Sequence, residues 1–466
     1  MVDDDAEKLI AWIEANLKGK VQRCERQMRW RQAWFVDLLR DGELLPIYVR
    51  GDRKEEFQTW PLEYETGVLR KLHAAGIPVP EIYGICPDPK AVVMERRPGR
   101  PGLSRARSEE ERVSLLEQLA EHMAAMHALD IAPFRELGGG MVDPEEDEQW
   151  SLSPFMRAGE RFYLKYKDKP NPAMEFVRKW LRTNIPDKPR ELTLIHGDPG
   201  QFIFENGKIT SMLDFELASF GDPMMDIAAM RLRALHEPMG DLSPLFRRYV
   251  EITGKPIDPQ VLAYQTAMFS AGTALLISPS LEHVKGGIDY PEYISWNIIS
   301  LLFIVVAIAE SKGIALDRPV PLEASAPARW HFNLDVIEQT FGASADSGAA
   351  VSDEEAYRQG LARRLVAFER QREQIGRVAE AEYITDVTEL TGTRTTDWRE
   401  ADRVLEDYVL TASPADDEKL LILFHRWCWR QFQMLKGVVS GHADPTEAHD
   451  LEMWELELQP ISQILA

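Results

Sequence analysis

The sequence predicts an α+β fold with two lobes, in which a small β-rich lobe precedes a larger helical lobe and a helical extension follows. Short β-type runs separated by turn residues dominate the first part of the chain. The pattern in residues 242–312 is helical and unusually apolar, and the composition beyond residue 352 is charge-rich with helical periodicity. We therefore expect an N-terminal lobe over residues 1–95, a second lobe over 96–312, a linker over 313–352 and a helical domain over 353–466.

The elements of the N-terminal lobe are predicted from apolar spacing and turn residues. Residues 6–17 have the spacing of an amphipathic helix, and residues 61–74 form a second helix that ends before Gly76. An Asp41-Gly42 turn joins two of the strands, because Asp and Gly both tolerate positive φ. Strands are predicted at residues 21–26, 32–39, 44–50, 81–86 and 91–95.

Residues 192–231 hold the chemical groups around which the rest of the chain is organised. An apolar run at 192–195 predicts a buried strand that delivers Asp198 to a loop. Two further β-type runs follow, separated by an Asn-Gly pair at 206–207, and the second of them ends at Asp214. Asp198 and Asp214 therefore flank one hairpin and are expected to lie close together. Two converging carboxylates need a cation, a shared proton or a basic partner, and a phosphoryl-transfer site supplies the cation as Mg²⁺.

Three motifs stand at linked spacing in this segment: His196-Gly197-Asp198, then Leu213-Asp214-Phe215-Glu216, then Gly221-Asp222-Pro223 followed by Asp226. Together they resemble the aminoglycoside phosphotransferase/choline kinase family, which comprises small-molecule kinases built on the protein-kinase fold. The resemblance covers residues 20–310 or so and implies a bilobal protein-kinase-like fold.

The resemblance also implies roles for the acidic residues. Asp198 would orient the attacking hydroxyl and accept its proton, and Asp214 would bind Mg²⁺. The family's further metal ligand, an Asn five residues after the catalytic Asp, is replaced here by Ile203. Gln201 is the expected substitute ligand, although a solvent-facing glutamine is the alternative, and Glu216 is expected to support the metal site.

Three residues are expected to support the site without touching substrate. His196 would orient the loop, Asp222 would cap the helix that follows it, and Asp226 would brace the loop. None of the three is expected to be the base.

The nucleotide-binding residues follow from the same resemblance. Arg50 would pair with phosphate in place of the family's basic residue, held by Glu65 with Glu63 in reserve. The loop at residues 26–31 contains no glycine, so either its arginines contact phosphate directly or the loop does not cover the nucleotide. A solvated basic turn is the plainer alternative. The backbone of the segment between the lobes would bind the adenine edge, at Met94, Glu95 and Arg96.

Composition narrows the class of protein. A net charge of −22 argues against general affinity for nucleic acid or anionic membranes. The three widely spaced cysteines form no disulfide framework or zinc pattern, so we expect a reducing, cytoplasmic location. The N-terminus lacks the basic-then-apolar pattern of a signal peptide. The longest apolar run, residues 298–309, is too short to span a bilayer and predicts a buried helix.

The expected function is transfer of the γ-phosphoryl group of ATP or GTP to a hydroxyl group of a small molecule, dependent on Mg²⁺. A nucleotide-binding pseudokinase or scaffold without turnover is the alternative from another class. The segment also resembles the kinase-like proteins associated with acyl-CoA dehydrogenases, which makes a hydroxyacyl compound an alternative to an aminoglycoside as acceptor. The aromatic residues within 424–432 predict a helix face buried against the kinase domain or another subunit, so these C-terminal helices are candidates for a homo-oligomer interface.

Overall fold

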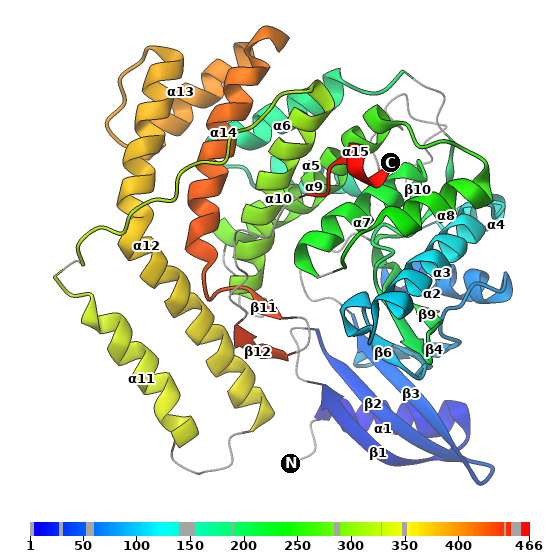
Figure 1. The fold of residues 1–466 in the computed structure, drawn as a ribbon. Helices are drawn as coiled ribbons and strands as arrows, with labels where there is room; N and C mark the ends of the chain where they lie inside the picture. The colour runs from blue at the N-terminus through cyan, green and yellow to red at the C-terminus, as the bar shows by residue number, and fades with distance from the viewer. Residues whose placement is uncertain are drawn as a thin grey trace. The chain divides into compact units, whose positions relative to one another are not determined.

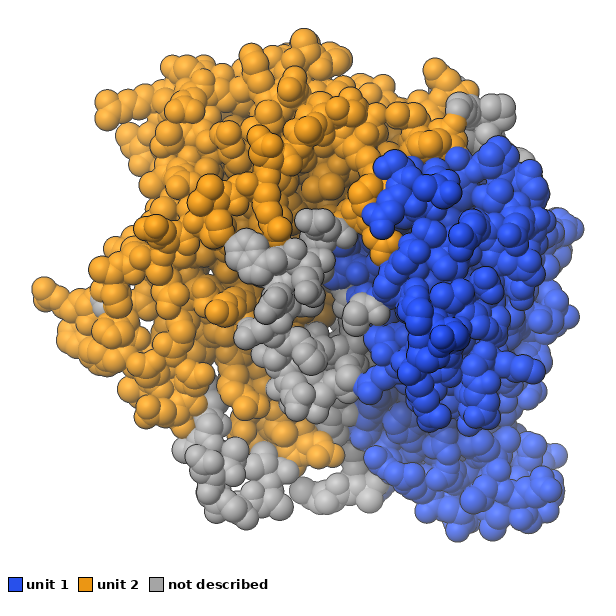
Figure 2. Space-filling view, in the orientation of Figure 1, with its two compact units in different colours: residues 1–155, 189–257, 461–466 blue, residues 156–188, 258–460 orange. Residues whose placement is uncertain are grey.

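The computed structural model describes residues 4–27, 31–52, 60–138, 154–187, 191–237, 239–283, 289–327, 329–346, 352–441, 444–448 and 458–466. The chain forms two compact units (Figure 2). Unit 1 comprises residues 1–155, 189–257 and 461–466, and unit 2 comprises residues 156–188 and 258–460. The expected α+β class is confirmed, since strands dominate the start of the chain and helices dominate the rest.

An antiparallel five-stranded sheet forms the N-terminal part of unit 1 (Figure 1). The Asp41-Gly42 turn is confirmed, because the two residues have φ of 54° and 86° and Arg40 pairs with Glu43 across it. The strand order is β1-β2-β3-β5-β4, with β1 at Lys20–Gln27, β2 at Ala33–Arg40, β3 at Glu43–Gly51, β4 at Ile82–Pro87 and β5 at Lys90–Glu95.

Successive side chains of a strand point to opposite faces of the sheet, so neighbouring residues of this sheet belong to two different apolar clusters. Helix α1 (Asp4–Leu17) buries Ile13 in a cluster that includes Val93 of β5. Helix α2 (Leu62–Ala74) buries its own first residue against Val92, the neighbour of Val93. The two helices therefore cover opposite faces, and the carboxylates of α2 can reach the sheet residues on one of them.

The remaining elements of unit 1 surround the predicted catalytic segment. Helix α3 packs along α8, and β7 pairs with β10 while β6, β8 and β9 form a small sheet. These elements are β6 (Arg100–Pro101), α3 (Glu109–His127), α4 (Ala132–Arg135), β7 (Thr193–Ile195), β8 (Phe202–Glu205), β9 (Lys208–Met212), β10 (Ser219–Gly221), α7 (Met224–His236), α8 (Ser243–Thr253) and α15 (Ile461–Ile464).

Unit 2 is helical, apart from the short strand pair β11 (Ser440–Gly441) and β12 (Asp444–Ala448) in its described residues. Helices α9 and α10 pack along one another at its centre, and α14 packs on α10. The helices are α5 (Pro154–Tyr166), α6 (Pro172–Thr183), α9 (Pro259–Glu282), α10 (Tyr290–Lys312), α11 (Phe332–Asp346), α12 (Asp353–Thr391), α13 (Trp398–Thr411) and α14 (Asp417–Phe432).

The two central helices of unit 2 are longer than the apolar run at 298–309 suggested. With 24 and 23 residues, α9 and α10 are long and apolar enough to cross a membrane by length and composition. However, 83% and 67% of their most apolar windows are buried inside the structure. A buried core helix meets the same criterion, so this observation is weak evidence for a membrane span.

The compact units divide the chain differently from the expected lobes. Residues 258–312, which we assigned to the second lobe, group with residues 353–460 of the expected C-terminal domain. The expected linker at 313–352 contains helix α11, which extends to Asp346, and residues 347–351 lie outside the described part. Helices that are apolar on all sides need partners on all sides, and α14 and α12 supply some of them for α10. Independent folding of the expected domains stays a prediction.

A buried carboxyl group in unit 2 gives a test of this packing. Burial raises the pKa of Asp402 to about 6, and its Oδ1 accepts a hydrogen bond from Tyr383 at 2.6 Å. Because the folded state favours the protonated form, Asp402 makes unit 2 less stable as pH rises from about 4 to about 6. Asp402→Asn keeps an acceptor for Tyr383 without the charge, so it should stabilise the protein by up to about 3 kcal/mol above pH 7. In urea unfolding measured at several pH values, the gain should shrink toward pH 5, and a gain that does not depend on pH would contradict this account.

Candidate active site

The hairpin that joins Asp198 to Asp214 has the expected geometry. Its turn residues, Asn206 and Gly207, have φ of 51° and 72°, and Phe202 pairs with Met212 at the open end. At that end the backbone N–H of the residue before Asp214 donates to the carbonyl of Gln201 at 2.8 Å. The two carboxylates therefore start and end one short, hydrogen-bonded unit, as the sequence predicted.

Asp226 fixes the loop that carries Asp198. Its two carboxylate oxygens accept hydrogen bonds from the backbone N–H groups of His196 and Gly197, each at 2.8 Å, and Asp226 is fully buried. Its Oδ2 also lies 3.0 Å from Nε2 of His127, a buried residue on α3. The geometry agrees with the bracing role expected for Asp226 and connects the loop to two helices.

His196 is part of this brace, since its Nδ1 accepts a hydrogen bond from the backbone N–H of Asp198 at 3.2 Å. Burial lowers the pKa of His196, against the raising effect of Asp226. Gly197 has φ of 89°, and a Cβ there would lie 2.6 Å from the Cβ of Leu217. Glycine is therefore the residue that fits at position 197. The side chain of Asp222 accepts from the N–H of Met224 at 2.9 Å and so caps the start of α7, although the N-cap position is Pro223 and Asp222 lies one residue earlier than expected.

Two side chains donate hydrogen bonds to the same carboxylate oxygen of Asp198. Its Oδ2 accepts from Nε2 of Gln201 at 2.8 Å and from Nη1 of Arg233 at 2.7 Å. Gln201 thus turns its amide nitrogen toward Asp198, which leaves its amide oxygen as the atom for the expected metal contact. Arg233 comes from α7 and was missed, because an arginine on an amphipathic helix gives no sequence signal of the side to which it points.

Arg50 connects the N-terminal sheet to Asp214. Its Nη1 lies 2.5 Å from Oδ1 of Asp214, and its Nη2 forms an ion pair with Glu65. Glu63 instead is exposed and pairs with Lys90, so Glu65 is the inward-facing carboxylate of α2, as preferred. Burial acts to lower the pKa of Arg50, but the two carboxylates outweigh it and raise the pKa above its ordinary value.

Asp214 has a left-handed backbone with φ of 62°, which a non-glycine residue rarely adopts. The conformation falls between the end of β9 and the short 3₁₀ helix at Phe215–Leu217. In this conformation the carboxylate accepts a hydrogen bond from Arg50. Asp is among the residues that tolerate this region best.

A second arginine–carboxylate pair was not predicted. The Nη1 of Arg31 lies 2.7 Å from Oε2 of Glu216, and its Nε donates to the carbonyl of Gly51 at 2.7 Å. Burial and then the neighbouring Arg50 lower the pKa of Arg31. Residues 28–30 of the glycine-free loop lie outside the described part, so direct phosphate contact by that loop stays a prediction.

The segment expected to bind the adenine edge already uses two of its backbone donors. The N–H of Glu95 donates to Glu81 at 2.8 Å, and the N–H of Arg96 donates to Pro46 at 3.1 Å. A base placed there would use carbonyl oxygens or the following residue. The contacts of Met94, Glu95 and Arg96 with a nucleotide stay a prediction.

The residues present fit Mg²⁺ that is shared with nucleotide phosphates. Magnesium in phosphoryl-transfer sites is held by one or two carboxylates together with phosphate oxygens. Asp214 and Glu216 supply two carboxylates, each facing a buried arginine. Among the described residues no group of three or more His, Cys, Asp or Glu side chains could hold a metal by itself. The donor set therefore suits a cation held by Asp214 and the nucleotide, rather than a closed protein cage.

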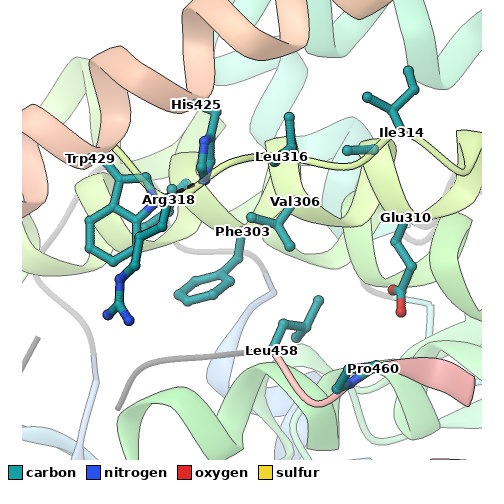
Figure 3. Close-up of a pocket in the computed structure, with 12 residues that line it drawn as sticks. Phe303, Val306, Glu310, Ile314, Leu316, Arg318, His425, Trp429, Leu458 and Pro460 are labelled. Carbon is teal, nitrogen blue, oxygen red and sulfur yellow. Dashed lines mark hydrogen bonds between the residues drawn. The ribbon is translucent and has the colours of Figure 1, made fainter. Parts of the chain in front are cut away.

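Unit 2 contains a separate pocket of about 290 Å³ (Figure 3). At one end the guanidinium of Arg318 lies 5.1 Å from the ring centroid of Trp429, whose Nε1 donates to Nε2 of His425 at 2.8 Å. Burial lowers the pKa of His425 to about 4, so this histidine is neutral at neutral pH. Among the described lining residues Glu310 is the one carboxylate, most of the others are apolar, and they show no acid–base pair or phosphate-binding pattern. We assign no chemistry to it.

The metal roles can be separated by titration. Asp214→Asn should raise the Mg²⁺ concentration needed for half-maximal nucleotide binding on the order of tenfold, because a carboxylate ligand becomes a neutral amide. Gln201→Ala should raise it less and should also lower turnover, because Asp198 loses one donor. Calorimetric Mg²⁺ titrations of the three proteins in the presence of nucleotide measure the first effect, and nucleoside diphosphate release measures turnover. Lower turnover with unchanged Mg²⁺ dependence in Gln201→Ala would restrict Gln201 to holding Asp198.

Residues 50–256 match the model of the phosphotransferase enzyme family. The match includes every expected site residue from Arg50 to Asp226 and also Arg233, so the resemblance inferred from the motifs is confirmed for this part of the chain. Among curated proteins, the mouse acyl-CoA dehydrogenase family member 11 is 27% identical over 263 residues, which cover 49% of this chain and 31% of that protein. The chicken family member 11 is 30% identical over 42% of this chain and 25% of its own length. The chain thus spans less than a third of the length of these relatives.

Solved structures resemble the chain more weakly. The choline kinase LicA from Streptococcus pneumoniae aligns with a TM-score of 0.48 at 17% identity, covering 65% of this chain and 98% of its own. The aminoglycoside phosphotransferase APH(4)-Ia aligns with a TM-score of 0.47 at 17% identity, over 65% of this chain and 98% of its own. At these values the similarity carries no argument about function.

Proposed function

We propose that the chain transfers the γ-phosphoryl group of ATP or GTP to a hydroxyl group of a small molecule, on the premise that residues 50–256, which match the phosphotransferase enzyme family, work as such an enzyme. One observation carries the proposal. Arg50 joins Glu65 to Asp214, while Asp198 is held at the other end of the same hairpin. A phosphate-binding cation, a candidate metal ligand and a candidate base are thereby brought to one place.

In the proposed reaction the acceptor oxygen forms a bond to the γ-phosphorus. The bond between that phosphorus and the β–γ bridging oxygen breaks, and the nucleoside diphosphate leaves with its electron pair. The hydroxyl proton passes to Asp198, which orients the acceptor. Arg50 compensates phosphate charge from a buried position, where a charge interaction is stronger than in water. When bound through Asp214, Mg²⁺ would add charge compensation at the phosphate oxygens.

For the acceptor we propose a hydroxyacyl compound ahead of an aminoglycoside. Support comes from the curated relatives, which are named as acyl-CoA dehydrogenase family members. Because the match covers a minor part of those proteins, their own substrates are not carried over. The proposal concerns only the class of acceptor.

A second candidate function is nucleotide binding without turnover. The ion pair between Asp198 and Arg233 favours it, because one oxygen of the candidate base is already occupied by a cation. The intact pair of Asp198 and Asp214 favours the kinase.

Nucleoside diphosphate release by the purified full chain distinguishes the two. ATP or GTP would be offered with hydroxyacyl thioesters, amino alcohols such as choline, aminoglycosides and sugars, each with and without Mg²⁺. We expect release that depends on both Mg²⁺ and a hydroxyacyl acceptor. Release with another acceptor class would overturn the acceptor proposal alone, and nucleotide binding without acceptor-dependent release would support the second candidate.

A further inference from the structure

Arg233 occupies a position in the candidate site that the residue roles above do not explain. It lies on α7, 35 residues beyond Asp198 in the chain, and its Nη1 is 2.7 Å from Oδ2 of Asp198. Its Nη2 lies 2.5 Å from Oε1 of Glu237, which is buried. The guanidinium fork therefore spans two carboxylates, with one arm on the candidate base.

Gly200 explains how Arg233 reaches this position. A Cβ on Gly200 would lie 2.5 Å from Cδ of Arg233, closer than real Cβ contacts come. The side chain of Arg233 thus passes through the space that a side chain at position 200 would take, two residues after Asp198. The lack of a side chain at Gly200 therefore makes room for Arg233 to reach Asp198.

The two carboxylate oxygens of Asp198 differ in their hydrogen bonding. In the described part of the chain, the hydrogen bonds to this carboxylate from Gln201 and Arg233 both go to Oδ2. Two donors on one oxygen fix the orientation of the carboxylate plane. Oδ1 is then the oxygen left to accept the proton of an acceptor hydroxyl.

Charge compensation agrees with this arrangement. Burial acts to lower the pKa of Arg233, but Asp198 and Glu237 outweigh it and raise the pKa, so the side chain stays cationic. A cation at this point also offsets negative charge that gathers near Asp198 when phosphate approaches it.

We propose that Arg233 is a positioning residue for phosphoryl transfer: reaching over Gly200, it holds Asp198 by Oδ2 so that Oδ1 meets the acceptor hydroxyl. The inference rests on the proposed function and adds to it a residue outside the three motifs. It also makes Gly200 a requirement of the site, since any side chain there displaces the arginine.

Steady-state kinetics with the acceptor found in the panel test the role. Arg233→Met should lower kcat on the order of 10²-fold, because small misplacements of a reacting group are costly, while the KM for nucleotide changes by less than about threefold. Arg233→Lys keeps the charge without the fork and should lower kcat on the order of tenfold. Added guanidinium should restore part of the rate of Arg233→Ala and none of the rate of Asp198→Asn.

Two controls separate positioning from folding. Arg233→Met leaves the buried Glu237 without this cation, so the double change Arg233→Met/Glu237→Gln should melt closer to the wild type and keep the low kcat. Arg248→Ala removes an arginine from α8 that pairs with Glu121 and Glu251 rather than with Asp198, and should leave kcat unchanged.

The outcomes are distinct. The role of Arg233 alone is overturned if the wild type phosphorylates an acceptor and Arg233→Met keeps the wild-type kcat. It is also overturned if the kcat of Arg233→Met falls only in proportion to the amount of folded protein. A wild type that turns over no acceptor overturns the proposed function, and the role of Arg233 with it.

Discussion

Asp198→Asn should leave nucleotide binding nearly intact and lower turnover by a factor on the order of a hundred or more. The amide keeps one oxygen that can accept from Gln201 and Arg233, so the loop should hold its shape. The uncharged amide then presents its N–H group to the acceptor hydroxyl. The side chain can no longer take the proton, although placement and charge compensation by other groups remain. Calorimetry gives the nucleotide Kd, and nucleoside diphosphate release gives kcat.

Asp41→Asn is a matched control for this substitution. Asp41 is exposed in the β2–β3 turn with φ of 54°, a conformation that Asn tolerates equally well. It should change neither Kd nor kcat. If Asp198→Asn and Asp41→Asn gave equally small effects, Asp198 would not be the base.

A chain that ends at Phe341 should lose the fold of unit 2, rather than leave a stable lobe. It lacks α12, α13 and α14, and α14 packs directly on α10. From α12, Arg364 forms buried ion pairs with Glu292 at 2.7 Å and Asp289 at 3.3 Å, and both buried carboxylates would lose this cation. Leaving buried charges unpaired costs several kcal/mol. Soluble yield and melting by circular dichroism measure the outcome.

Point changes on α12 isolate the ion-pair contribution from the loss of the helices. Arg364→Met should destabilise the protein by about 3–5 kcal/mol. Arg358→Met, on the same helix, breaks only an exposed pair with Glu354 and should cost less than about 1 kcal/mol. A chain ending at Phe341 that melts like the full-length protein would show that residues 353–466 form an appendage, as the sequence first suggested.

Local chemistry made much of the site predictable. The Asn206-Gly207 and Asp41-Gly42 turns require positive φ, so the hairpins around them could be placed from sequence. The offset of two residues predicted that Glu63 and Glu65 face different sides of α2, and the resemblance to the family favoured Glu65 as the one that pairs with Arg50. These features depend on contacts of short range or on one helix face.

What the sequence did not show depends on which distant elements meet. Arg31 and Arg233 pair with Glu216 and Asp198 across 185 and 35 residues, and no local pattern marks either arginine. The division into units was hidden for a related reason. Helix α10 is apolar on most sides, which signals burial but not the partner, and one partner is α14, more than 100 residues later in the chain.

The central claim is that the hairpin between Asp198 and Asp214 serves γ-phosphoryl transfer. Transfer of an ¹⁸O-labelled γ-phosphoryl group from ATP, followed by mass spectrometry of the acceptor, tests it most directly. We expect the wild type to form a labelled phosphomonoester in the presence of Mg²⁺ and Asp198→Asn to form almost none. Nucleotide bound by both proteins with no labelled acceptor formed by either, or equal labelling by both, would contradict it.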